Sequence, residues 1–102
     1  MTIEDAWAAG LFEGEGSITH SHGRPELSLK MTDKDVMDRF CAWAECNHVR
    51  ETTQQQSHHK PCYRWRVGNQ KDVTRLLEKM LPFFGERRAY KALNVFDYYE
   101  CR

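Results

Sequence analysis

Two carboxylates, Glu13 and Glu15, lie between glycines at the end of a stretch that begins at Trp7 and runs through Gly16. The first part of this stretch has the pattern of an amphipathic helix, so the carboxylates fall at the C-terminal end of that helix. The helix macrodipole is already negative there, and a carboxylate is unfavourable unless a cation or a donor compensates it. Carboxylate oxygens gathered at such a point suit a hard divalent cation. The alternative is an ordinary exposed Glu-Gly-Glu-Gly turn that ends a helix.

The small residues Ala6, Gly10 and Gly14 recur along the same helix every four positions and therefore share one helical face. Two glycines inside a helix cost about 1 kcal/mol each relative to alanine, which favours a packing or functional reason for them. A face without side chains lets a second helix approach backbone to backbone. Two copies paired in this way would bring two Glu15 side chains together. The predicted dimer interface consists of Ala6, Gly10, Glu13 and Gly14. A neighbouring apolar stripe, expected in the core, consists of Ile3, Trp7 and Leu11.

Capping patterns and alternation predict the elements that position these residues. Thr2 with Asp5, Thr32 with Asp35, and Asn69 with Asp72 each mark the start of a helix. Apolar and polar residues alternate cleanly over residues 26–31, the clearest strand in the chain. Helices are expected to about residue 14, from 33 to about 45, from 69 to about 81, and from about 85 to the C-terminus. Strands are expected over residues 17–22, 26–31, 49–55 and 62–67.

If these strands form an antiparallel sheet with the helices on one face, the other face is free. Here the free face carries hydroxyl, amide and guanidinium groups. Arginine pairs with guanine and glutamine with adenine in the major groove, and serine and threonine adapt to several base edges. The structural alternative for each of these residues is a solvated side chain. The candidate DNA-binding residues are Ser17, Thr19, Ser21, Arg24, Glu26, Ser28, Lys30, Arg50, Thr52, Gln54, Arg64 and Arg66.

The charge is balanced overall but unevenly distributed. Fifteen Lys and Arg residues face fifteen Asp and Glu residues, which argues against a general polyanion binder. Residues 17–32 and 47–67 nevertheless hold six cationic side chains against two carboxylates, a net charge of +4. A basic strand region on an acidic helical body favours nucleic acid bound to one face. A random scatter of surface charge is the alternative.

The 102 residues are expected to form one domain, residues 1–102. No apolar run is long enough to span a membrane and no signal peptide opens the chain, so a cytoplasmic protein is expected. The four cysteines, Cys41, Cys46, Cys62 and Cys101, form no Cys-x-x-Cys pair. We interpret them as reduced thiols that mostly serve packing, in preference to a zinc site or a disulfide scaffold.

The stretch from Ala8 to Gly16 resembles the LAGLIDADG motif of the homing endonucleases. The identical positions are Ala9, Gly10, Leu11 and Gly16, and Glu13 and Glu15 replace the two aspartates of the motif. The expected order of elements is similar to the α-β-β-α-β-β-α arrangement of that family. The resemblance thus implies an α+β fold whose four-stranded antiparallel sheet forms a DNA-binding saddle.

A second segment supports the resemblance. Pro82-Phe83-Phe84, followed by Arg87, is similar to the family's Pro-aromatic stretch that leads to an active-site lysine. Arginine replaces that lysine here, and Lys34, Arg88 and Lys91 are alternatives for its electrostatic role.

The resemblance implies a homodimeric, Mg²⁺-dependent endodeoxyribonuclease that cuts double-stranded DNA at a long pseudo-palindromic site. It places Glu15 as catalytic carboxylate and metal ligand, the Gly14 carbonyl as a further ligand, Arg87 at the phosphate and Asp33 beside the water. Glu13 is expected to brace the motif. A gene in a prokaryotic, phage or organellar mobile element is the implied context. The alternative is a catalytically inactive DNA- or RNA-binding module, as in transcription factors and maturases.

Overall fold

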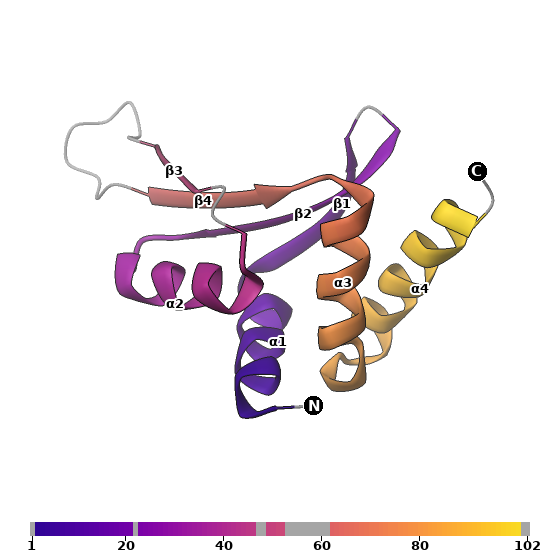
Figure 1. The fold of residues 1–102 in the computed structure, drawn as a ribbon, viewed down its shortest axis with the longest axis horizontal. Helices are drawn as coiled ribbons and strands as arrows, with labels where there is room; N and C mark the ends of the chain where they lie inside the picture. The colour runs from indigo at the N-terminus through magenta and orange to yellow at the C-terminus, as the bar shows by residue number, and fades with distance from the viewer. Residues whose placement is uncertain (1, 22, 47–48, 53–61, 101–102) are drawn as a thin grey trace.

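The computed structural model describes residues 2–21, 23–46, 49–52 and 62–100. Its class is α+β, and the helices and strands follow one another in the predicted order (Figure 1). A short 3-10 helix, η1, lies between the last two helices. The elements are α1 (Ile3–Glu15), β1 (Gly16–Ser21), β2 (Arg24–Met31), α2 (Lys34–Ala44), β3 (Val49–Thr52), β4 (Cys62–Val67), α3 (Gln70–Met80), η1 (Leu81–Phe83) and α4 (Glu86–Glu100).

The strands form one antiparallel sheet in the order β1-β2-β4-β3. The β1–β2 hairpin turns at Gly23, whose φ of 78° is a conformation that glycine adopts without steric cost. In Figure 1 the sheet lies along the top and the helices lie below it, so these helices cover one face of the sheet and no described helix covers the other. Period-two alternation therefore divides the strand residues into a core face and a free face.

The core lies between the sheet and the helices. Leu27, Leu29 and Trp65 face it from β2 and β4, and each is at most 1% exposed. Phe12 of α1 and Phe40 of α2 are fully buried beside them. Burial of side chains of this size contributes about 1.5–3 kcal/mol each, so these residues fix how α1 docks on the sheet.

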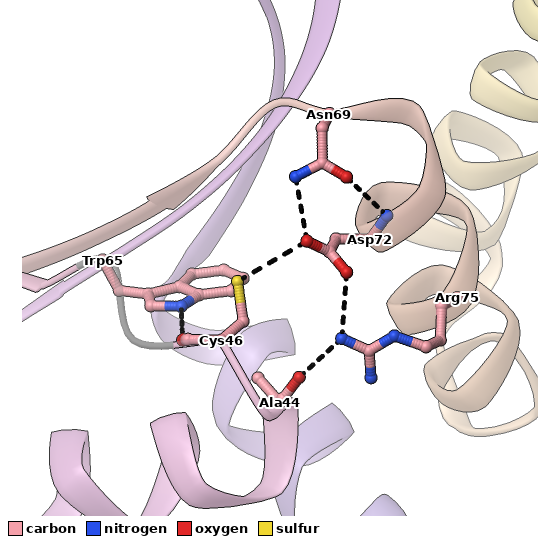
Figure 2. A network of polar contacts seen from close by, with 6 residues as sticks. All are labelled: Ala44, Cys46, Trp65, Asn69, Asp72 and Arg75. Atoms are coloured by element: carbon pink, nitrogen blue, oxygen red, sulfur yellow. Dashed lines mark hydrogen bonds and ion pairs between the residues drawn. The ribbon is translucent and has the colours of Figure 1, made fainter.

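A polar network fastens the end of α2 to β4 and α3 (Figure 2). The Trp65 indole donates to the Cys46 carbonyl at 2.9 Å, and Arg75 donates to the Ala44 carbonyl at 2.7 Å and to Asp72 at 3.2 Å. Asn69 caps α3 by accepting from the Asp72 backbone N–H at 2.9 Å. The last carbonyl of α2 is thus satisfied by a side chain of α3, and the first turn of α3 by its own N-cap. The network holds β4, a central strand of the free face, in place.

Two sequence predictions about the helices are wrong. The Thr32–Asp35 cap does not form, because α2 begins one residue later with Asp33 at its N-cap and no side-chain capping bond. Ile3, predicted in the core, is 86% exposed. The buried residues of α1 are Ala8, Ala9 and Phe12, whereas Trp7 and Leu11 are half-buried at the edge of the core.

The capping box of Thr2 and Asp5 is confirmed. The Asp5 N–H donates to the Thr2 hydroxyl at 3.0 Å, and the Thr2 N–H donates to the Asp5 carboxylate at 3.1 Å. The third predicted strand is described only over Val49–Thr52, and the remainder of residues 49–55 lies outside the described residues. Within the described segments, no helix has the length and apolar character that a membrane span requires.

Candidate active site and nucleic-acid interface

Glu15 is the last residue of α1, and the chain enters β1 directly after it. Gly16 is the C-cap: its φ is −89° and its N–H donates to the Phe12 carbonyl. A Cβ at Gly16 would overlap the ring of Phe12, so only glycine lets the helix pass this closely into the strand. Glu15 itself is exposed, and we find no hydrogen bond or ion pair to its carboxylate among the described residues. The carboxylate is thus free to bind a ligand at the junction of helix and sheet.

Glu13 has the opposite surroundings. One carboxylate oxygen accepts from the Gly85 N–H at 2.6 Å, and the other accepts from Arg88 Nε at 2.8 Å. The pKa of Glu13 is held below its usual value, chiefly by the hydrogen bond from the Gly85 N–H and also by the hydrogen bond and positive charge of Arg88. Glu13 was predicted both to brace the motif and to line a dimer interface. Its carboxylate contacts α4 and the residue before it in the same chain, which is a bracing position.

Arg88 is the basic residue of α4 that donates hydrogen bonds to the motif. Besides Glu13 Oε2, its guanidinium donates to the Gly16 carbonyl at 2.9 Å and to the Glu13 carbonyl at 3.0 Å, and it lies 5.4 Å from the centre of the Phe12 ring. Its side chain is 12% exposed. Arg87, which the sequence favoured, is exposed. Sequence spacing gave no indication of the Arg88 contacts, because they join residues more than seventy positions apart.

The other candidates for the electrostatic and water-organising roles are on the surface. Lys34 forms an ion pair with Asp38 at 3.1 Å, one helical turn later. Lys91 and Asp33 are exposed, and Asp33 lies at the N-cap of α2.

The predicted DNA-binding residues that lie within the described strands fall on the free face of the sheet by register. Ser17 pairs with Ser28 and Ser28 with Arg66, while Lys30 pairs with Arg64 and Arg64 with Arg50. The exposed members are Ser17, Thr19, Arg24, Lys30, Arg64 and Arg66, and the half-buried members are Glu26 and Ser28. Gln54 lies outside the described residues, as do the side chains of Ser21, Arg50 and Thr52.

One contact on this face modifies its charge. Arg66 Nε lies 3.3 Å from Glu26 Oε1, with Glu26 20% exposed and Arg66 51% exposed. Glu26 thus neutralises one of the cations and also holds Arg66 in one direction across the strands. Arg64, Lys30 and Arg24 have no such carboxylate partner among the described residues.

The small-residue face of α1 is open. Ala6, Gly10 and Gly14 are exposed, and a Cβ at either glycine would meet nothing within 4 Å. Ile3 falls on the same face at helical spacing, which explains why so large an apolar side chain is uncovered in the single chain. This face, Ile3–Ala6–Gly10–Gly14, consists of small residues and one apolar residue, the composition on which the predicted helix pairing rests.

The thiols of the described cysteines belong to the core, and Cys101 lies outside the described residues. Cys41, Cys46 and Cys62 are buried, and burial raises the pKa of Cys41 to about 11. In the described segments, no three His, Cys, Asp or Glu side chains are placed to hold a metal ion together.

Solved structures with a similar fold are homing endonucleases. I-CvuI, in complex with its target in the presence of Ca, matches with a TM-score of 0.68 and 18% identity over 94% of this chain. The group I intron-encoded I-CeuI, complexed with DNA, matches with a TM-score of 0.69 and 16% identity over 95% of this chain. The archaeal intron-encoded I-Vdi141I, also complexed with DNA, matches with a TM-score of 0.66 and 18% identity over 86% of this chain.

This chain spans 66%, 54% and 62% of those three chains, respectively. No protein-family model matches the sequence, and no curated protein matches it either. At identities below a fifth the likeness is one of fold. At that level it confirms the resemblance to LAGLIDADG homing endonucleases that the motif from Ala8 to Gly16 predicted.

Proposed function

We propose that this chain is a site-specific, metal-dependent endonuclease of double-stranded DNA, a homing endonuclease that acts as a homodimer. The observation that carries the proposal is the position of Glu15. Its carboxylate is exposed and without a partner among the described residues at the C-terminus of a helix, where the macrodipole disfavours it. The adjoining sheet presents a basic and hydroxyl-bearing face, so a negatively charged polymer and a cation would meet at this point.

The proposed DNA-binding surface is the free face of the sheet, with β3 as its fourth strand. Antiparallel strands in a major groove read bases by side chains on one face, and arginine to guanine is the commonest specific contact. Arg64 and Lys30, paired across β4 and β2, are the best placed to approach phosphate or base. Support comes from the similar folds of I-CeuI and I-Vdi141I, which were solved with DNA.

The proposed dimer forms through the open face of α1. Pairing two copies about a two-fold axis would cover Ile3 and bring the glycine surfaces together. The same symmetry places two Glu15 carboxylates near the axis and joins two sheets into one saddle, with residues 1–102 as one half. A two-fold protein predicts a palindromic or pseudo-palindromic DNA site.

The residues present fit a magnesium ion as half of a shared site. Glu15 contributes a carboxylate oxygen, and the Gly14 carbonyl has no hydrogen-bond donor among the described residues. These are hard oxygen ligands of the kind that Mg²⁺ prefers, and one chain supplies fewer of them than its octahedral shell needs. DNA phosphates, water and the second copy would supply the rest.

Bound there, Mg²⁺ would polarise the phosphate and make a water more acidic. The Glu15 carboxylate accepts the proton of the attacking water. Arg87, exposed on α4, donates to a phosphate oxygen as negative charge increases in the in-line displacement. Asp33 orients the water. On each strand the water oxygen bonds to phosphorus as the P–O bond to the leaving sugar oxygen breaks, and that oxygen takes up a proton from solvent water. Family resemblance implies cuts across the minor groove that leave 3′ overhangs.

The second candidate function is a DNA- or RNA-binding module without catalysis. It is favoured by the position of Arg88, because this side chain is bonded to Glu13 and to two backbone carbonyls and is only 12% exposed, so it does not reach toward a bound phosphate. The arginine that would replace the family's lysine is then Arg87 alone. A cytoplasmic setting in a prokaryotic, phage or organellar gene context suits both functions.

The test is incubation of the purified protein with a randomised or genomic DNA pool, with Mg²⁺ or with EDTA, followed by sequencing of the ends. Ends that require Mg²⁺ and cluster at one long, roughly palindromic site would support the endonuclease. Enrichment of such a site without new ends would favour the binding module. No enrichment and no ends would contradict both functions.

A further inference from the structure

One side chain holds the last turn of α1. Arg88 donates to the carbonyls of Glu13 and Gly16, and to the carboxylate of Glu13, at 2.8–3.0 Å. All three guanidinium nitrogens are used, and the fixed planar fork makes the arrangement geometrically demanding. The face of Phe12, itself fully buried, lies against the same group.

The two carbonyls bracket the residues that would bind metal. Gly14 and Glu15 are the only residues between Glu13 and Gly16 in the chain. The last carbonyls of a helix lack intrahelical donors and need partners from elsewhere. Here the carbonyl before the pair and the carbonyl after it are both fixed to Arg88, and the remaining freedom of the backbone between them is small.

Glycine makes this bracket necessary. Gly14 loses more conformational freedom on ordering than any other residue would, and no side chain of its own restrains it. A Cβ at Gly14 would meet nothing within 4 Å, so packing does not restrain it in the single chain either. The hydrogen bonds of α1 and the bond from the Gly16 N–H to the Phe12 carbonyl also hold this turn, and Arg88 adds a contact from another element on both sides of Gly14–Glu15.

We infer that Arg88 is a positioning residue: by fixing the carbonyls on both sides of Gly14–Glu15, it aims the Gly14 carbonyl and the Glu15 carboxylate at a shared divalent cation. The inference rests on the proposed function, because it requires the metal site. It differs from a direct electrostatic role at the phosphate, in which positive charge alone would suffice.

The test compares Arg88→Lys, Arg88→Gln and Arg39→Gln on the DNA site recovered from the pool. Arg39→Gln is the matched control, because Arg39 of α2 makes the same two kinds of contact to α1. Its Nε lies 3.2 Å from Oε2 of Glu4, and its guanidinium carbon lies 3.9 Å from the centre of the Trp7 ring. It does so at the other end of the helix. Ca²⁺ is titrated calorimetrically into each protein–DNA complex, and the Mg²⁺ concentration for half-maximal cleavage is measured. Circular dichroism at the assay temperature checks that each variant is folded.

Groups that orient metal ligands typically change metal affinity by about 10–100-fold when removed. We expect Arg88→Gln and Arg88→Lys both to weaken Ca²⁺ binding and to raise the Mg²⁺ midpoint by about tenfold or more. Lysine keeps the charge but cannot hold three acceptors in one plane. Arg39→Gln should lower the melting temperature without moving either metal measurement. Should Arg88→Gln fail to fold, Arg88→Lys decides.

Metal binding by Arg88→Lys equal to that of the wild type would overturn the inference and leave the proposed nuclease intact. An equal loss of metal affinity in Arg39→Gln would also overturn it, because the effect would then be general anchoring of α1. A wild-type complex that binds no Ca²⁺ and makes no Mg²⁺-dependent cut would overturn the inference together with the proposed function.

Discussion

Gly16→Ala should destabilise the fold, although the backbone conformation of Gly16 is open to any residue. Its φ of −89° and ψ of 168° are ordinary extended values, so alanine adds no backbone strain. The added Cβ would lie 2.6 Å from Cε2 and Cγ of Phe12, and closer still to Cδ2, whereas carbon atoms pack at about 3.5–4.0 Å. The cost of the substitution is therefore the overlap alone.

Phe12 cannot easily move away from the new methyl group. Its ring is fully buried, stacked on Phe84 with centroids 6.1 Å apart and edge-on to Phe40 at 6.5 Å. Overpacking of a well-packed core costs about 1–3 kcal/mol. For a domain of this size each kcal/mol lowers the melting temperature by about 4–8 °C.

The assay is thermal and urea unfolding followed by circular dichroism, at one protein concentration. Gly68→Ala is the control, because a Cβ at Gly68 meets nothing within 4 Å. That substitution should leave stability unchanged or raise it by about 0.4–1 kcal/mol through the unfolded state. A Gly16→Ala protein as stable as the Gly68→Ala protein would refute the close passage of the chain over Phe12.

Three further outcomes follow from the site. Gly10→Leu should abolish the dimer by separating the helix pair while the single chain stays folded, since a Cβ at Gly10 meets nothing within 4 Å; light scattering that still shows a dimer would reject the interface. Glu26→Gln should release Arg66 from its ion pair, so that DNA binds more tightly and the slope of log affinity against log salt concentration steepens by about one phosphate contact. Unchanged binding over a salt series would argue against the free face of the sheet as the DNA-binding surface. The pKa of Glu13 is lowered from 4.5, so its contribution to stability is complete above that pH and is lost as pH falls through the folded-state pKa. Urea unfolding should show wild type and Glu13→Gln differing at pH 7 and converging in acid, and a constant difference would contradict the contact with Gly85 and Arg88.

Local patterns predicted most of the elements. The alternation over residues 26–31 predicts most of β2, which begins two residues earlier at Arg24, and the cap formed by Asn69 gives the start of α3 as the structure has it. Register then follows from alternation, because a slip of one residue would exchange the faces of a strand. Alternation alone is therefore enough to place the polar strand residues together on one face of the sheet.

The faces of α1 could not be predicted in the same way. Apolar residues occur around most of the helix, and small residues bury as readily as large ones, so periodicity alone does not select a side. The structure buries Ala8 and Ala9 and exposes Ile3. Tertiary packing decided this, since small residues let α1 approach the other helices closely and Ile3 lies beyond the core.

The bracing of the motif also depends on tertiary structure. Arg87 and Arg88 are adjacent in sequence but about 100° apart around a helix. Which of the two meets Glu13 depends on how α4 docks, and the sequence contains no periodic signal for that. The contact joins residues 75 positions apart and is visible only after folding.

The most direct test of Glu15 is cleavage by a Glu15→Gln protein at the DNA site recovered from the pool, with binding and oligomeric state measured in parallel. An amide is a poor Mg²⁺ ligand and cannot accept the water proton, whereas the exposed position of Glu15 means that the fold should not change. We expect dimerisation and duplex binding close to those of the wild type and no Mg²⁺-dependent cutting. Cutting at the wild-type rate by Glu15→Gln would remove Glu15 from the mechanism.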